Sequence, residues 1–192
     1  MKLLITGFEP FGGDAVNPSW EAVQALPEQV GHHQIYKLRL PVVFGQAADL
    51  AIAEAERLHA DVVLAIGLAG GRKAVTPEVI GINLRNAGIP DNAGLQPHDD
   101  PIISGAPAAY FSTLPVRAMK EAICAVDIPA ALSYSAGVYV CNDVMYSLLH
   151  HFADTPQVRC GFMHVPYLPD MGTPSLPLEK ITAAIKAAVG VL

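Results

Sequence analysis

Residues 44–66 read FGQAADLAIAEAERLHADVVLAI and join two segments of different composition. The first, Phe44 to His59, is rich in alanine and glutamate, which favour a helix, and it stops before Asp61. The second, Val62 to Ile66, is a short and wholly apolar run, typical of a strand that is covered on both faces. A helix followed by a buried strand is the repeating unit of α/β folds, in which right-handed crossovers place helices over a sheet.

The same alternation of apolar runs and helical segments continues along the chain and predicts an α/β fold with a sheet between helices. The first helix is expected at Asn17-Pro18, because asparagine is a good capping residue and proline is favoured at the first helical position. The expected strands are Lys2 to Thr6, Ile35 to Leu40, Val62 to Ile66, Val79 to Leu84, Ala130 to Ser135 and Val158 to His164. The expected helices begin at Asn17, span Phe44 to His59, follow Pro115 with an apolar stripe of Val116, Met119, Ile123 and Val126, start at Asn142, and run from about Pro177 to just before Gly190.

One long segment breaks this alternation. Between Arg85 and Phe111, glycines and prolines interrupt any helical or strand period. Loops of this length in compact domains are usually functional or disordered. Two interpretations remain open for this segment: a lid over a site, or a contact between subunits.

Length and charge narrow the class of protein. The chain has 192 residues, 52% of them hydrophobic, and a formal net charge of −6. This length suits one domain, residues 1–192, with a sizeable core. The acidic balance and the lack of a Lys/Arg cluster argue against nucleic acid or an anionic membrane as a partner, because both need a basic surface. A small neutral ligand or a peptide fits better.

The N-terminus and the cysteines indicate the compartment. Met1 to Gly7 contains too short an apolar run for a signal peptide or a membrane span, and we expect a first strand there. The three cysteines, Cys124, Cys141 and Cys160, have no C-x-x-C spacing, so neither a disulfide framework nor a thiolate zinc site is indicated. We therefore expect a cytoplasmic protein.

Cys141 is the candidate nucleophile. It lies where an extended segment changes to an amphipathic helix, and unpaired N–H groups at a helix N-terminus lower the pKa of a nearby thiol. The competing interpretation is a buried and inert cysteine, which is the commoner fate of a free cysteine. Cys124, beside the apolar stripe of the third helix, and Cys160, within a strand, are both expected to be structural.

A nucleophilic thiol needs a base, and the base needs an orienting group. Among the histidines, His164 alone closes an apolar strand, and ligands bind at the C-terminal ends of strands in open α/β sheets. A core histidine bonded to the backbone is the alternative. Glu78 precedes the apolar run Val79 to Ile82 and is a candidate orienting carboxylate, or otherwise a solvated strand end.

The loop after the first strand, Thr6 to Gly13, contains glycines without the G-x-G-x-x-G spacing of a nucleotide site. It also contains two phenylalanines, Phe8 and Phe11, separated by Pro10. Paired aromatic side chains at this place suit a flat, uncharged ring, or alternatively they fill the core.

Together these segments resemble the pyroglutamyl peptidase I (pyrrolidone-carboxylate peptidase) family over nearly the whole chain and in the same order. The likeness rests on five stretches. They are Thr6 to Gly13 with Asn17-Pro18-Ser19-Trp20, Gly70-Gly71-Arg72 with Glu78 and Ile82-Asn83, Ile89 to Asn92, Cys141-Asn142 with Met145-Tyr146, and His164 to Pro169.

The resemblance implies a three-layer α/β/α sandwich like the phosphorylase/hydrolase group, with a mixed central sheet. It also implies a cysteine peptidase that removes N-terminal pyroglutamate from peptides through a thioester, without metal or other cofactor, as a homodimer or tetramer. By resemblance, the catalytic residues are Glu78, Cys141 and His164, Phe8 and Phe11 form the aromatic walls of the pocket, and Asn17 with the backbone around Tyr139 and Val140 completes it.

Three positions depart from the family pattern. Leu68 stands where a glutamine is usual beside the pocket, Gly88 where an arginine is usual, and Val79 where an arginine commonly follows the glutamate. The first two keep other functions open: a related cysteine amidase with a changed acyl pocket, or a binding protein that keeps the fold and the pocket without turnover.

Overall fold

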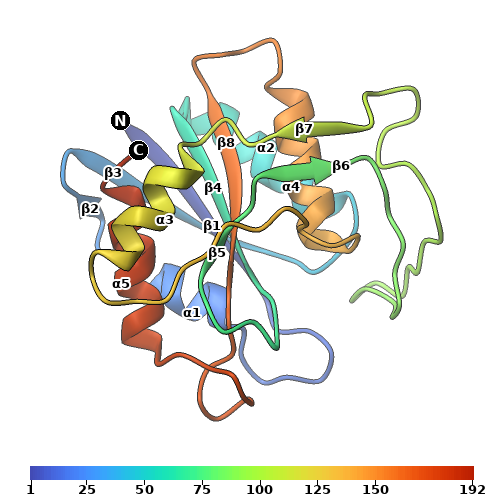
Figure 1. Ribbon diagram of the computed structural model, residues 1–192. Helices are drawn as coiled ribbons and strands as arrows, with labels where there is room; N and C mark the ends of the chain where they lie inside the picture. Colours follow the sequence, from blue (N-terminus) through green and yellow to red (C-terminus); the bar gives the residue numbers. More distant parts are fainter.

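A computed structural model describes all 192 residues of the chain as three layers, with a central sheet between two sets of helices (Figure 1). The strand order in the sheet is β2-β3-β1-β4-β8-β5. The four inner strands β3, β1, β4 and β8 are parallel, whereas β2 and β5 run antiparallel at the two edges. The expected α/β class and the mixed central sheet are therefore confirmed.

The elements follow the alternation of the sequence. The strands are β1 Lys2–Phe8, β2 Gln29–Val30, β3 His33–Leu40, β4 Val62–Leu68, β5 Thr76–Pro77, β6 Ile80–Ile82, β7 Ala109–Phe111 and β8 Arg159–Val165. The helices are α1 Pro18–Gln24, α2 Gln46–Leu58, α3 Val116–Cys124, α4 Val140–His151 and α5 Leu178–Val189. None of these helices is long and apolar enough to cross a membrane.

Two apolar cores lie on the two faces of the sheet. Side chains alternate along a strand, so Leu3 and Ile5 of β1 pack in one core and Leu4 packs in the other. The core that contains Leu3 is covered by α1, α3 and α5, and the core that contains Leu4 is covered by α2 and α4. Because both faces are buried, the inner strands are apolar throughout, as β4 illustrates.

Two of the expected strands are wrong. The run expected from Val79 to Leu84 is reduced to β6, which pairs with β7 in a separate two-stranded sheet and ends where the Leu84 N–H bonds to the Ile82 carbonyl. Residues 130–135 form no strand, and only isolated bridges join Ala130 to Val75 and Ser133 to Glu78. This segment has a neighbour on one side only, and that neighbour, β5, is two residues long.

Two helix ends also differ from the expected ones. Helix α4 starts at Val140 rather than Asn142, so Cys141 belongs to the first helical turn. Helix α3 ends at Cys124, so Val126 lies beyond it and is 46% exposed instead of completing the apolar stripe.

The segment 85–111 is tied to the rest of the protein by polar contacts at several points. Arg85 donates to the buried carboxylate of Asp143 in α4 at 2.6 Å. Asp91 accepts the Phe44 N–H at 2.9 Å, and the Asn92 amide donates to Glu9 at 2.8 Å. The segment therefore braces the loop after β1 and the approach to α4, and the charge that the family usually has at residue 88 is not needed for these contacts.

The start of α4 is fixed by the fully buried amide of Asn142. Its oxygen accepts the Ile82 N–H at 2.9 Å, and its nitrogen donates to the carbonyls of Ile82 at 2.8 Å and Leu84 at 3.0 Å. The amide thus bonds to the backbone at the end of β6 as a neighbouring strand would, and it fixes the residue next to Cys141.

We predict that Asn142→Ala destabilises the protein by at least about 2 kcal/mol, because each buried polar group left without a partner costs roughly 1–3 kcal/mol. Urea unfolding measures this change. Asn86→Ala is the matched control: Asn86 is exposed, and its replacement is expected to change the free energy of unfolding by less than about 0.5 kcal/mol. Equal urea midpoints for Asn142→Ala and wild type would contradict the role of this amide.

Candidate active site

The site lies at the C-terminal ends of three adjacent parallel strands, β1, β4 and β8. Phe162 of β8 packs in the core under α2 and α4, and His164, two residues later, projects from the same face of the sheet. Phe8 closes β1 on this face, and Gly67 of β4 pairs in register with His164. The alternation of side chains therefore directs Phe8 and His164 toward the layer that contains α4.

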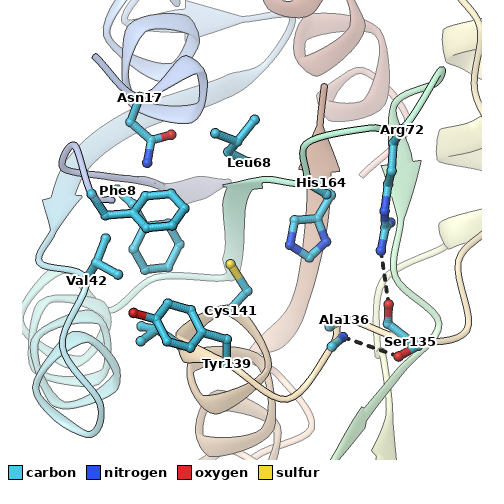
Figure 2. Close-up of a pocket in the computed structure, with 14 residues that line it drawn as sticks. Phe8, Asn17, Val42, Leu68, Arg72, Ser135, Ala136, Tyr139, Cys141 and His164 are labelled. Carbon is cyan, nitrogen blue, oxygen red and sulfur yellow. Dashed lines mark hydrogen bonds between the residues drawn. The ribbon is translucent and has the colours of Figure 1, made fainter. Parts of the chain in front are cut away.

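Cys141 reaches this place from the first turn of α4, directly above Gly67. A β-carbon added to Gly67 would lie 2.8 Å from the Cys141 sulfur and 2.7 Å from the Phe162 ring. The sulfur thus occupies space that any side chain at residue 67 would fill. Figure 2 shows the thiol and the His164 imidazole facing the same cavity.

Glu78 lies behind His164. One carboxylate oxygen, Oε1, lies 2.7 Å from His164 Nδ1, and both side chains are buried. Because a carboxylate only accepts, Nδ1 is the protonated nitrogen, and Nε2 is left free to accept a proton from another group. The structure therefore brings together the three residues to which the sequence assigned catalytic roles.

The charge state of the thiol differs from the expected one. Burial, and secondly the nearby Glu78 carboxylate, raise the pKa of the Cys141 thiol to about 12, although Arg72 opposes this shift. Burial also lowers the pKa of His164 below its usual value, against the opposing effect of Glu78. Burial thus outweighs the lowering of the thiol pKa that was expected from the helix N-terminus, and the two shifts together favour a neutral thiol beside a neutral imidazole.

The other two cysteines lie elsewhere. Cys160 is buried as expected, and burial raises its pKa to about 12. Cys124, which was expected to be structural beside the apolar stripe of α3, is exposed at the end of this helix.

A cavity of about 480 Å³ opens over the thiol and the imidazole. Its wall is mainly apolar and contains no Asp or Glu side chain. Figure 2 shows the aromatic rings of Phe8 and Tyr139 on one side of Cys141 and Arg72 on the far side of His164. The lining residues are Phe8, Phe11, Asn17, Val42, Leu68, Ala69, Arg72, Ser135, Ala136, Gly137, Tyr139, Val140, Cys141 and His164.

Each aromatic wall is held by the scaffold. Phe8 is 2% exposed and belongs both to the core and to the cavity wall. Phe11 lies 6.4 Å from the Tyr139 ring, centroid to centroid. Tyr139 packs edge-on against Phe44 at 5.2 Å, and its hydroxyl donates to the Pro90 carbonyl at 3.0 Å.

Asn17 supports the loop that holds these phenylalanines. Its oxygen accepts the Ser19 N–H at 3.1 Å and caps α1, and its nitrogen donates to the Glu9 carbonyl at 3.0 Å. Ser19 in turn accepts the Phe8 N–H at 3.0 Å. Asn17 thus lines the cavity and also fixes the position of Phe8.

Helix α4 begins at Val140, and the capping residue before it, Tyr139, makes no side-chain hydrogen bond to the first turn. The N–H groups of a first helical turn have no intrahelical partner, so those around Val140 and Cys141 are available to an anion in the cavity.

Sequence reasoning gave no role to three residues at the site. Gly67 was not singled out because its importance depends on where the sulfur lies. Val42 was missed because nothing in its local sequence marks it as part of a wall. Arg72 was noted only as part of a family stretch, yet it lies 2.6 Å from Glu78.

Leu68 and Gly88, two of the departures from the family pattern, differ in their position relative to the cavity. Leu68 lines the cavity beside Asn17 (Figure 2). Gly88 does not line it, and a β-carbon there would meet no atom within 4 Å. Of the two, Leu68 alone is placed to contact a ligand.

We predict that Gly67→Ala displaces the Cys141 sulfur, lowers its rate of alkylation by iodoacetamide, and destabilises the protein by about 1–3 kcal/mol, the usual cost of overpacking. Mass spectrometry of the alkylated peptide and urea unfolding measure the two effects. Gly88→Ala is the control, since the added methyl group meets open space. Wild-type alkylation and stability in Gly67→Ala would show that the sulfur does not depend on this glycine.

A sequence profile of the family described as pyroglutamyl peptidase matches residues 1–192. The pyrrolidone-carboxylate peptidase 1 of Photorhabdus laumondii is 48% identical over 199 residues, covering 97% of this chain and 90% of that protein. The pyrrolidone-carboxylate peptidase of Levilactobacillus brevis is also 48% identical over 199 residues, covering 98% of both chains.

Solved structures agree with these relatives. The crystal structure of Bacillus amyloliquefaciens pyroglutamyl peptidase I is similar with a TM-score of 0.96 and 42% identity, covering 99% of this chain and 95% of that one. A mutant pyrrolidone carboxyl peptidase of Pyrococcus furiosus gives 0.94 and 42%, covering 100% of this chain and 97% of that one. The resemblance inferred from the sequence is confirmed, and this chain belongs to the pyroglutamyl peptidase I family, whose members are cysteine omega peptidases.

Proposed function

We propose that this protein hydrolyses the bond after an N-terminal pyroglutamyl residue of peptides, with Cys141 as nucleophile, His164 as base and Glu78 as the orienting carboxylate. The main support is that Cys141 and His164 line one apolar cavity, while Glu78, behind His164, is bonded to its imidazole at 2.7 Å. A nucleophile, a base and a group that orients the base are the elements of a cysteine hydrolase.

The charge of the cavity wall favours a blocked N-terminus. Pyroglutamate is a neutral lactam, so it has no α-ammonium group for a carboxylate to bind. The cavity wall has no carboxylate. Its one permanently charged side chain, Arg72, would repel an ammonium group. Phe8 and Tyr139 provide flat apolar surfaces for the lactam ring.

Acylation starts from the neutral pair. His164 Nε2 takes the proton of Cys141, and the sulfur attacks the pyroglutamyl carbonyl carbon, whose π electrons move to oxygen. Collapse of this adduct breaks the C–N bond, and the His164 imidazolium gives its proton to the leaving amine. The imidazolium exists only during the reaction. The negative charge of the Glu78 carboxylate stabilises it when it forms.

Deacylation uses the same groups, with a water molecule as the nucleophile and the Cys141 sulfur as the leaving group. A water molecule gives a proton to His164 Nε2 and attacks the thioester carbon. The C–S bond then breaks, free pyroglutamate leaves, and the proton returns to the sulfur. Backbone N–H groups at the start of α4 are the donors for the oxyanion, each worth about 3 kcal/mol in enzymes where one was removed.

The proposed setting is a homodimer or tetramer in the cytoplasm. The three cysteines are free, as suits a reducing compartment. The acidic net charge gives no basic surface for nucleic acid.

A related cysteine amidase with a changed acyl pocket is the second candidate function. The observation in its favour is Leu68, an apolar side chain in the cavity wall where relatives usually have an amide. A panel of acyl amides that includes other small cyclic acyl groups separates the two functions by their ratios of kcat/KM.

We expect wild type to release a fluorescent amine from its pyroglutamyl amide and not from the prolyl amide. Cys141→Ala should have no activity above background, and Glu78→Gln should lose about 10²–10⁴-fold in kcat, the range that general acid–base catalysis contributes. Urea unfolding verifies that both variants are folded. A folded, reduced wild type without turnover would contradict the proposed substrate.

The pH profile of kcat/KM tests the role of Glu78 separately. The Glu78 carboxylate raises the pKa of His164 against the larger lowering effect of burial, so Glu78→Gln should lower this pKa further. The acid limb, which reports the base of the free enzyme, should therefore move to lower pH. An acid limb at the wild-type pH would show that Glu78 does not act on the pKa of His164.

A further inference from the structure

Arg72 contacts the same carboxylate oxygen that orients the base. Its Nη1 lies 2.6 Å from Glu78 Oε1, and His164 Nδ1 lies 2.7 Å from this oxygen. The other oxygen, Oε2, is buried and has no hydrogen-bond partner. The orientation of the Glu78 carboxylate therefore depends on two contacts to one oxygen, and only one of them is with a permanent cation.

Further contacts fix the guanidinium itself. Nη1 also donates to the hydroxyl of Thr76, and Nη2 donates to the Ser135 carbonyl at 3.1 Å. Both N–H bonds of Nη1 are therefore used within the protein. Arg72 joins β5 to the segment before α4, and its terminal nitrogen is committed to Glu78 rather than to a ligand.

We propose that Arg72 is a positioning residue, whose guanidinium holds the Glu78 carboxylate in place and aimed at His164. This inference rests on the proposed roles of Cys141, His164 and Glu78. Glu78 is fully buried, and a buried carboxylate without a counter-charge either takes up a proton or turns toward water. Either change removes the acceptor from His164 Nδ1 and with it the tautomer that leaves Nε2 free.

The two charges also act in opposite directions on the reacting pair. Burial raises the pKa of the Cys141 thiol and lowers the pKa of His164, and the Glu78 carboxylate raises both. The Arg72 guanidinium lowers both. Arg72 therefore offsets the unfavourable effect of Glu78 on the thiolate while it holds Glu78 in place for the imidazolium.

A double-mutant cycle in the full-length protein tests whether Arg72 acts through Glu78. The readout is the rate of Cys141 alkylation by iodoacetamide as a function of pH, which needs no substrate. The variants are Arg72→Gln, Glu78→Gln, the double variant, and Arg72→Lys. Lys73→Gln is the matched control, because it removes an exposed positive charge one residue away.

We expect Arg72→Gln to slow alkylation at pH 7 by about tenfold, the change that one unit in the thiol pKa produces well below that pKa. In the Glu78→Gln background the same substitution should slow alkylation by a clearly smaller factor, because only the direct effect of Arg72 on the thiol then remains. Arg72→Lys should recover most of the lost rate, and Lys73→Gln should match wild type. The pH at which the rate is half-maximal should rise in Arg72→Gln and not in Lys73→Gln.

Three results would overturn the proposal: a wild-type rate in Arg72→Gln, the same loss in both backgrounds, or no recovery in Arg72→Lys. If Arg72 only stabilised the structure, it would act independently of Glu78, and the loss would be the same in both backgrounds. Turnover of the pyroglutamyl amide is measured in parallel. If wild type does not hydrolyse the amide but the alkylation cycle gives the expected pattern, the proposed substrate is wrong and the role of Arg72 stands.

Discussion

The hydrogen bond between Glu78 and His164 joins two strands that run in opposite directions at the edge of the sheet. His164 lies near the end of β8, and Glu78 follows β5, the short antiparallel strand beside it. The Glu78 N–H bonds to the Phe162 carbonyl at 2.9 Å, which sets the register between them. Since side chains alternate along both strands, a shift of one residue would turn the carboxylate to the other face of the sheet.

The position of the proposed nucleophile, Cys141, depends on a different constraint, which is the lack of a side chain at Gly67. Helix α4 packs against the sheet on the face where His164 projects, and its first turn lies over β4. The sulfur fits there because Gly67 leaves the space open. Asn142 fixes the same helical turn through the backbone of Ile82 and Leu84. The site therefore requires one vacant position and one buried amide as much as it requires reactive groups.

The sequence predicted the inner parallel strands and most helices, because their apolar patterns are local and long enough to read. It failed for residues 79–84 and 130–135, because short strands at the edge of a sheet are decided by what pairs with them. It predicted the three reactive residues through their places at element ends and through family resemblance. It predicted the wrong direction for the Cys141 pKa, because a local sequence shows the helix N-terminus but not the burial around the sulfur.

Because Cys141 and His164 form a neutral pair in the proposed resting state, the arrangement of buried charges at this site changes when the proton moves. Before the reaction, the Glu78 carboxylate is matched by Arg72, while Cys141 and His164 are uncharged. Transfer of one proton from sulfur to imidazole produces the series thiolate, imidazolium, carboxylate and guanidinium, in which each charge faces one of opposite sign. The net charge is zero before and after the transfer, so no isolated charge is created where the dielectric is low. The same low dielectric strengthens the attraction between neighbours in this series, which offsets part of the desolvation cost of forming the thiolate.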